Sequence, residues 1–412
     1  MSVDARRDPR PPAPLLAVDA LTTILPTRGG ALHAVDGVSF TLGAGEVLGV
    51  VGESGSGKTM LARTVMGLAP PAARTSGSVR FAGRNLLDAR PRDLREVLGP
   101  GLAMVFQDPA TALNPVTRIG RQLVESLRLR RGLDRRAARD QAVGLLARVG
   151  IPDPERRAAS YPHELSGGMR QRVSIALAVA CGPRVLLADE PTTALDVTVQ
   201  RQILDLLADL QRGEGMGMLL ITHDLAVVAE RTERLMVMYA GQIVESGPTP
   251  AVVRAPRHPY TAALLASTPR LDRPIHARLD TVPGQPAIPV DPAAGCRFAP
   301  RCPRAQPRCR RESPRPTTVT GPITLASDAA APTRAHTVAC FHPTPPATPD
   351  AIPTATLTAT LTATPGATPI ATPTATPTAA GTPGAPDPGG LHGQPVRVPP
   401  PAGRLDAGGD AP

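Results

Sequence analysis

Gly52-Glu-Ser-Gly-Ser-Gly-Lys-Thr59 decides the fold of this 412-residue chain. The stretch fulfils the phosphate-loop pattern Gly-x4-Gly-Lys-Ser/Thr, in which backbone N–H groups and a helix N-terminus bind phosphate oxygens. Its flanks fit, because the apolar run 46–51 suits a buried parallel strand and residues 59–66 suit the helix that follows. The pattern predicts an α/β fold that binds a nucleotide through Gly52, Glu53, Ser54, Gly55, Ser56, Gly57, Lys58 and Thr59.

Lys58 is the only lysine among 45 basic residues, the others all being arginine. A compact ammonium on a flexible stem suits a phosphate cradle better than a planar guanidinium does. We therefore expect Lys58 to reach the β and γ phosphates and Thr59 to hold Mg²⁺.

Composition narrows the class of protein. Apolar residues make up 42% of the chain, which suffices for a core, but no run is long enough to span a membrane and no signal peptide begins the sequence. The net charge of +10 suggests nucleic acid, yet no nucleic-acid motif accompanies it. We interpret the arginines of residues 118–157 as the solvated face of an amphipathic helical segment, and we expect no nucleic-acid partner.

Two further apolar runs, 184–190 and 217–222, end in polar side chains. The first ends in Asp189 and Glu190, and the second is followed by His223. Open α/β sheets bind ligands at the carboxyl ends of their strands, so these groups are expected near the phosphates. One carboxylate can hold Mg²⁺ and the next can orient an attacking water, while His223 can contact the γ phosphate.

The order of these motifs resembles the nucleotide-binding subunits of ABC transporters, because Met104-Val-Phe-Gln107 and Leu165-Ser-Gly-Gly-Met-Arg-Gln171 lie between them. The resemblance covers about residues 15–269 and implies a P-loop NTPase fold with a helical subdomain at about 110–162. It also implies that two such domains pair head to tail, each signature closing the other's ATP site. A second helix N-terminus, before the run 169–180, supports this, since one domain needs only one such phosphate site for its own ATP.

The resemblance also implies roles for single residues. These are catalysis by Glu190, His223 and Gln107; Mg²⁺ binding by Thr59, Gln107 and Asp189; a signature of Ser166, Gly167, Gly168 and Gln171; and a D-loop of Ala194-Leu-Asp196. One feature departs from the family, which usually stacks adenine on an aromatic residue upstream of the phosphate loop. The first aromatic here is Phe40, expected in a strand at 38–41, and the upstream region offers only Leu25 or His33.

The C-terminal third of the chain indicates which subfamily of ABC transporters it resembles. His258-Pro-Tyr-Thr-Ala-Ala-Leu-Leu265, residues 295–302 and Val338-Ala-Cys340 resemble the extension of dipeptide, oligopeptide and nickel importer ATPases. The resemblance implies an ATP-driven motor for peptide import, with nickel or another small solute as an alternative. It implies two permease subunits, a second ATPase subunit that is a copy or a relative, an external binding protein, and a peripheral place on the cytoplasmic face of the membrane. A soluble ABC ATPase outside transport is the alternative from another class.

Four of five cysteines fall in this extension, as Cys296, Cys302, Cys309 and Cys340. Inside a cell they favour metal ligation over disulfides, but they lack the Cys-x2–4-Cys spacing of most structural zinc sites. The resemblance implies a [4Fe–4S] cluster, with zinc or free thiols as alternatives. Neighbouring Arg297, Arg301, Arg304 and Arg308 would offset its charge, while Cys181 is expected in an apolar helix of the core.

These observations divide the chain into four parts: a disordered N-terminus at 1–14, an ATPase domain at 15–265, the cysteine-containing extension at 266–342, and a Thr/Pro/Ala-rich tail at 343–412. The tail has almost no charge and no large side chains, so it is expected to be disordered. Because every ATP motif precedes residue 266, we expect loss of a cysteine to loosen the extension and spare ATP binding.

Overall fold

The computed structural model describes residues 13–193, 195–268, 281–319 and 335–345. Its contacts divide the chain into one unit of residues 1–362 and another of residues 363–412, and the second lies outside the described residues. So do most of the predicted disordered N-terminus and tail, parts of the extension, and Ala194 of the D-loop.

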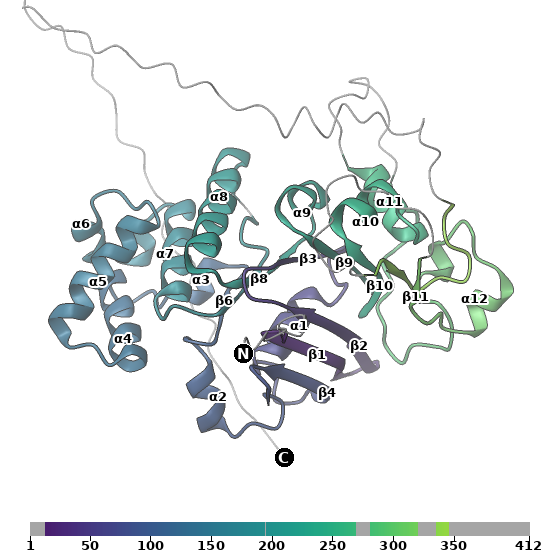
Figure 1. Cartoon of the computed structure of the whole chain (residues 1–412), viewed down its shortest axis with the longest axis horizontal. Helices are drawn as coiled ribbons and strands as arrows, with labels where there is room; N and C mark the ends of the chain where they lie inside the picture. The colour runs from purple at the N-terminus through teal and green to yellow at the C-terminus, as the bar shows by residue number, and fades with distance from the viewer. Residues whose placement is uncertain (1–12, 194, 269–280, 320–334, 346–412) are drawn as a thin grey trace, which may run out of the picture. The chain divides into compact units, whose positions relative to one another are not determined.

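A mostly parallel sheet forms the centre of the described unit (Figure 1). Its strand order is β11-β12-β10-β9-β3-β8-β7-β6, with β6, β7, β8, β3 and β9 parallel. The apolar sequences of β3, β7 and β8 are buried along their whole length, as expected for parallel strands covered on both faces. The strands are β3 (Val47–Val51), β6 (Leu102–Val105), β7 (Val185–Asp189), β8 (Gly217–Thr222), β9 (Arg234–Tyr239), β10 (Gln242–Pro248), β11 (Thr317–Thr318) and β12 (Thr337–Val338).

An antiparallel sheet packs beside it, in the order β2-β1-β4-β5. Helix α1 (Lys58–Val65) contacts β1, β2 and β7, and its Leu61 and Val65 share one apolar core with residues of both sheets. The α/β P-loop fold predicted from the sequence is confirmed, and so is the strand that contains Phe40. The strands are β1 (Leu16–Thr27), β2 (Gly30–Leu42), β4 (Arg74–Phe81) and β5 (Arg84–Asn85).

A helical segment follows β6, as the sequence predicted (Figure 1). Its helix α4 buries Ile119, Leu123 and Leu127, one residue per turn, and exposes Arg121, Arg128, Arg130 and Arg131. This amphipathic pattern agrees with the interpretation of the first basic cluster as a solvated face. The elements are α3 (Pro109–Ala112), α4 (Ile119–Arg131), α5 (Arg135–Arg148), α6 (Pro154–Ala158), the 3₁₀ helix η1 (Pro162–Glu164) and α7 (Gly167–Val179).

The position expected for Cys181 is wrong in one respect. Helix α7 ends at Val179, and Gly182 adopts a left-handed conformation with φ 64°, which turns the chain out of the helix. Cys181 therefore lies in the turn after the helix and is only half-buried.

The remaining helices cover the sheet or belong to the extension. They are α2 (Pro91–Val97), α8 (Val197–Glu214), α9 (Leu225–Arg231), α10 (Thr249–Arg254), α11 (Pro259–Ser267), the 3₁₀ helix η2 (Ala299–Arg301) and α12 (Pro307–Arg311). Helix α11 crosses the boundary predicted at 265/266, which stays a prediction.

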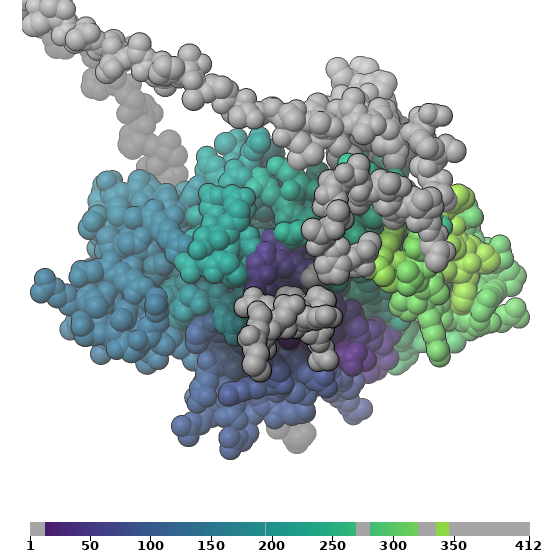
Figure 2. Space-filling view, viewed as in Figure 1, coloured from purple at the N-terminus to yellow at the C-terminus, as the bar shows by residue number. Residues whose placement is uncertain are grey.

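The extension joins the ATPase core directly. Strand β12 pairs with β10, and Asp291 exchanges hydrogen bonds with Ala31 in the β1–β2 hairpin. The surface of the extension, green in Figure 2, accordingly borders the purple N-terminal strands. Phe298 of the extension packs on Tyr239 and Tyr260, with ring centroids 5.2 and 5.3 Å away, and the three side chains belong to a core that also includes Val51 of β3.

Candidate ATP site

The phosphate loop connects β3 to α1, as its sequence required. Gly57 has φ 103° at the helix N-cap, and a Cβ there would lie 2.1 Å from the backbone oxygen of Ala34. A side chain is excluded twice, by backbone conformation and by space, so this glycine permits the close approach of the loop to β2.

Lys58 folds back over the loop that precedes it. Its ammonium donates to the carbonyl oxygens of Gly52 at 2.7 Å and Glu53 at 3.0 Å, and lies 3.8 Å from Glu190 Oε1. Burial lowers the pKa of Lys58, while the nearby carboxylates of Glu190, Asp189 and Glu53 oppose that shift. The cation is therefore placed between the loop and the acidic strand end, where a phosphate chain would meet it.

Thr59 and Asp189 form the oxygen pair expected for Mg²⁺. The Thr59 hydroxyl donates to Asp189 Oδ1 at 3.2 Å, and Asp189 is 1% exposed at the end of β7. Burial raises the pKa of Asp189 to about 6, and the Thr59 hydrogen bond partly counteracts it. A divalent cation prefers such oxygen ligands and would stabilise the ionised carboxylate.

Four side chains converge on Glu190, just after β7. Gln107 Nε2 and the Thr193 hydroxyl donate to Glu190 Oε2 at 3.0 and 2.9 Å, His223 Nδ1 lies 3.4 Å from the same oxygen, and Lys58 approaches Oε1. Glu190 itself has a left-handed φ of 45°, a strained conformation for a residue with a side chain. The sequence-predicted catalytic set thus meets around one carboxylate whose orientation is fixed.

Thr193 was missed by sequence reasoning. It lies three residues after Glu190, and its hydroxyl donates back to that carboxylate while its backbone N–H donates to the Glu190 carbonyl oxygen. The pattern Glu-Pro-Thr-Thr after a buried strand contains this signal, since a hydroxyl three residues on reaches back across a turn.

The signature residues lie apart from this centre. Ser166 caps α7 by accepting from the Met169 N–H at 3.3 Å, and Gly167 and Gly168 form the first turn. No hydrogen bond or ion pair between described residues joins the signature to the phosphate loop. Gln171 is 2% exposed, so its side chain faces the protein interior rather than a ligand surface. Asp196 of the D-loop caps α8 through the Val199 N–H at 2.9 Å.

Neither upstream candidate for an adenine contact is a Phe, Tyr or Trp, but the structure adds a neighbour that the sequence did not predict. The backbone N–H of His33 donates to the Pro289 carbonyl oxygen at 2.9 Å, and Leu32 forms a bridge with Val290. Extension residues 289–291 therefore cover the hairpin in which the base contact was expected.

The four extension cysteines line one cavity, together with His258 and His342 among others. All four are free thiols in the described chain, and the free space among them is about 10 Å³, roughly one water molecule. Burial raises the pKa values of Cys296 and Cys302, and that of Cys340 to about 11. Among the described residues, no three His, Cys, Asp or Glu side chains are grouped closely enough to hold one metal ion.

The arginines beside these cysteines have other partners than the sequence suggested. Arg297 pairs with Asp36, Arg301 pairs with Glu53, and Arg308 pairs with Glu312 at 2.8 Å. The charges of these three are therefore largely compensated by carboxylates, which lowers their capacity to offset a negatively charged cluster, whereas Arg304 donates to the His342 carbonyl oxygen at 3.3 Å.

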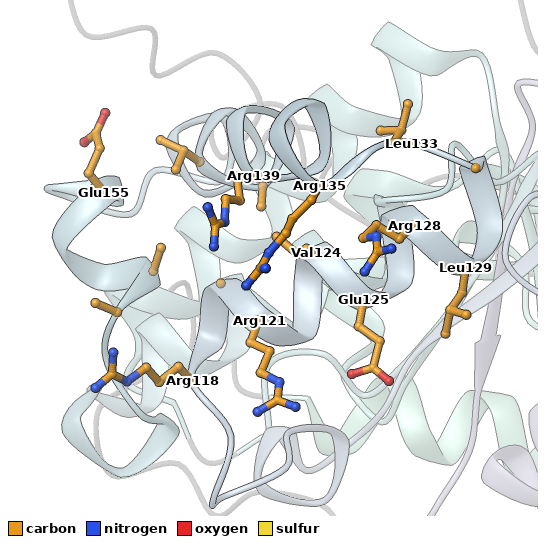
Figure 3. A pocket seen from close by; sticks show the side chains of 16 residues that line it. Arg118, Arg121, Val124, Glu125, Arg128, Leu129, Leu133, Arg135, Arg139 and Glu155 are labelled. Carbon is orange, nitrogen blue, oxygen red and sulfur yellow. The ribbon is translucent and has the colours of Figure 1, made fainter.

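A surface cavity of about 1260 Å³ lies on the helical segment, away from these centres (Figure 3). Arginines from α4 and α5 surround it, and its walls are otherwise largely apolar. Those arginines are Arg121, Arg128, Arg135 and Arg139, with Arg118 at the start of α4.

The profile of the ABC transporter family matches residues 35–193, and that of the oligopeptide/dipeptide transporter C-terminal region matches residues 244–309. A putative peptide import ATP-binding protein of Brucella abortus is 52% identical over 295 residues, 71% of this chain and 89% of the relative. The dipeptide transport ATP-binding protein DppD of Escherichia coli is 47% identical over 301 residues, 73% of this chain and 92% of the relative.

Solved structures of ATP-binding cassettes also resemble this chain. The ATP-binding cassette MJ0796, solved as a dimer in a post-hydrolysis state with ADP and Pi, superposes with a TM-score of 0.52 at 27% identity, covering 57% of this chain and 98% of that one. The phosphate loop, the carboxylate pair at the end of β7 and the signature before α7 define an ABC-type ATPase. The chain belongs to the ABC transporter family, in the group that carries the oligopeptide/dipeptide transporter C-terminal region. It is the ATP-hydrolysing subunit of such a transporter, and ATP with Mg²⁺ is its general cofactor pair.

Proposed function

We propose that this chain drives the import of dipeptides or oligopeptides. The observation that carries the proposal is the C-terminal region matched at residues 244–309, together with relatives named for peptide import and dipeptide transport. Nickel or another small solute is the alternative within the same family.

The residues around Glu190 support a specific division of labour in hydrolysis. Thr59, Asp189 and the carbonyl oxygen of Gln107 would hold Mg²⁺, which neutralises phosphate charge when bound. Glu190 orients and polarises the attacking water, because Gln107, Thr193 and Lys58 fix its carboxylate. His223, whose side chain is 61% exposed, is free to turn toward the γ phosphate.

The signature residues support a head-to-tail pair of ATPase subunits. Ser166–Gly168 present a helix N-terminus that no described contact connects to the chain's own phosphate loop, so their phosphate partner would be the ATP of a second subunit. Asp196 follows the catalytic strand and would lie at the same interface. The dimeric cassette that resembles this chain provides a precedent for the pairing.

We propose two permease subunits and an external binding protein as further partners, with the chain held peripherally on the cytoplasmic face of the membrane. Among the described residues, no helix combines the length and apolar character needed to cross a bilayer. The arginine-lined cavity on α4 and α5 is a candidate docking surface for a permease, because it combines exposed cations with apolar walls.

We propose a [4Fe–4S] cluster at the four thiols, with zinc or free thiols as the alternatives. Four thiolates are the usual ligand set of such a cluster, and the four cysteines line one cavity. Cys296, Cys302, Cys309 and Cys340 would hold the cluster, which would have to widen the cavity.

Uptake of labelled peptides by cells tests the function. We expect Glu190→Gln to abolish dipeptide or oligopeptide uptake at normal protein level, whereas Glu96→Gln, a carboxylate exposed on α2, should leave uptake intact. Loss of nickel uptake with peptide uptake preserved would overturn the choice of solute. Recovery of soluble proteins without permease chains in a native purification would overturn the transport role. Iron and zinc content after anaerobic purification tests the cluster.

A further inference from the structure

An arginine of the C-terminal extension binds the phosphate loop itself. Arg301 Nη1 donates to Glu53 Oε2 at 2.6 Å, and Nη2 donates to Glu53 Oε1 at 3.0 Å. Two parallel hydrogen bonds between a guanidinium and a carboxylate fix both distance and orientation. Glu53 is the second residue of the phosphate loop, so this contact joins two segments 248 residues apart in the sequence.

Arg301 is itself held firmly. Its Nε donates to the Pro283 carbonyl oxygen at 2.7 Å and its Nη2 also donates to that of Val282 at 3.2 Å. The guanidinium carbon lies 5.7 Å from the ring centre of Tyr239 and 6.0 Å from that of Phe298. The side chain is 4% exposed, so solvent screens the ion pair weakly. A fixed guanidinium fixes the carboxylate that it binds.

The backbone of the loop is held from the same side. The N–H of Glu53 donates to Tyr260 Oη at 2.9 Å, and Tyr260 is fully buried at the start of α11. The Tyr260 ring packs on Tyr239 with centroids 4.7 Å apart. Both the side chain and the backbone of Glu53 thus depend on residues that lie after the last ATPase motif.

The charge of Glu53 explains why this contact concerns ATP. Glu53 is an anion in a loop whose other groups attract phosphate, and it lies close enough to Lys58 to influence the charge of that ammonium. An unpaired carboxylate there would repel a triphosphate and attract Lys58 away from it. The Arg301 guanidinium cancels this charge.

We propose that Arg301 is a positioning residue of the ATP site, which holds Glu53 neutralised and the phosphate loop in its binding conformation. The inference rests on the ATPase activity and not on the identity of the transported solute. Because Arg301 directly precedes Cys302, the four-cysteine site is connected to the phosphate loop by adjacent residues. On this proposal, disruption of the extension weakens ATP binding, contrary to the prediction that loss of a cysteine spares it.

The test compares ATP affinity in four forms of the full chain: wild type, Arg301→Gln, Glu53→Gln and the double variant. We expect Arg301→Gln to weaken ATP binding about tenfold, the effect of one uncompensated charge near the phosphates. In the Glu53→Gln background the same substitution should change affinity less than about threefold, because no carboxylate is left unpaired. Arg301→Lys, which keeps the charge but not the paired hydrogen bonds, should give an intermediate affinity.

Arg297→Gln is the matched control. Arg297 is also an extension arginine, with a side chain 9% exposed, and pairs with Asp36, which is outside the phosphate loop. Thermal unfolding of both variants reports any general damage to the extension. If Arg301→Gln and Arg297→Gln weaken ATP binding equally, or if the loss at Arg301 is the same with and without the Glu53 carboxylate, Arg301 is a structural residue only and the proposal is wrong.

Discussion

The ATP site and the four-cysteine site are built in opposite ways. The ATP site collects its groups at the ends of parallel strands and at helix N-termini, so regular backbone places Lys58, Asp189 and Glu190. The cysteine site collects its thiols from loops and short helical turns, and Cys309 is its one thiol in a described helix. A site on strand ends keeps its geometry without a ligand, whereas a site on loops depends on what binds there.

Arg301 and Tyr260 nevertheless connect the two sites. On the proposal made for Arg301, the extension supports the phosphate loop through these contacts.

The largest expected effect is on the rate of ATP hydrolysis, and it involves only the ATP site. Glu190→Gln should lower kcat for ATP hydrolysis by at least about 100-fold, since it removes the charge that polarises water and keeps the side chain's shape. Affinity for ATP should stay within about threefold of the wild-type value. Steady-state hydrolysis and equilibrium ATP binding measure the two quantities, with exposed Glu96→Gln as control. Wild-type turnover would assign the water to another group.

Lys58→Arg tests whether the cradle needs a small cation. The Lys58 ammonium fits between two loop carbonyl oxygens and is buried, so a planar guanidinium has neither the room nor the matching donors. ATP affinity should fall about tenfold or more, a cost of about 1.4 kcal/mol. Arg63→Lys, an exposed change of cation on the same helix, should be neutral. Equal ATP affinity in both variants would mean that ATP binding does not require a lysine at this position.

Cys302→Ser tests whether the extension supports ATP binding without taking part in hydrolysis. We expect faster proteolysis of the extension, by about tenfold, because the loop that carries the thiol opens more often. ATP affinity should fall about threefold through displacement of Arg301, with kcat changed less. Cys181→Ser, in the half-buried turn after α7, should change neither quantity. A loosened extension with unchanged ATP affinity would show that the two sites are independent.

A last effect concerns stability and not ATP binding, and it is set by His258. Burial lowers the pKa of His258 to about 4, from an ordinary value of 6.5, and the Glu245 carboxylate only partly opposes the shift. The Nδ1 of His258 accepts the Tyr260 N–H at the start of α11. Glu245 accepts the His258 backbone N–H at 2.8 Å and bonds His336 Nε2 at 2.7 Å, so it is already engaged. Between these two values the unfolded chain binds the proton and the folded chain does not, so stability falls as the pH falls.

The contribution of His258 to this loss is about 2 kcal/mol between pH 7.5 and pH 5, and the difference in urea unfolding between the wild type and His258→Asn measures it, because the raised pKa of Asp189 acts in the opposite direction in both proteins. His258→Asn keeps a capping acceptor without a titrating group, and its stability should vary less over the same range. An identical pH dependence in both proteins would assign the titration to another residue.

Local pattern was enough to predict much of the ATP site. Residues 217–222 form a strand with the predicted bounds, and the strand predicted at 46–51 and the helix predicted at 59–66 shift by one residue at most. Asp189, Glu190 and His223 lie where strand ends predicted them, because parallel strands in register bring their carboxyl ends to one edge. The contact of Thr193 was also predictable from the sequence, because its hydroxyl lies three residues after a carboxylate.

Long-range contacts could not be predicted in this way. The sequence by itself determined the fold class, because a phosphate-loop pattern lies between an apolar strand and a helix, and it indicated the family through the resemblance of its ordered motifs. Only the tertiary structure decided that Arg301 pairs with Glu53, that residues 289–291 cover the β1–β2 hairpin and that Gln171 faces inward. The physical reason is that a charged side chain is paired by whatever the fold brings within a few ångströms, and sequence distance carries no information about that partner.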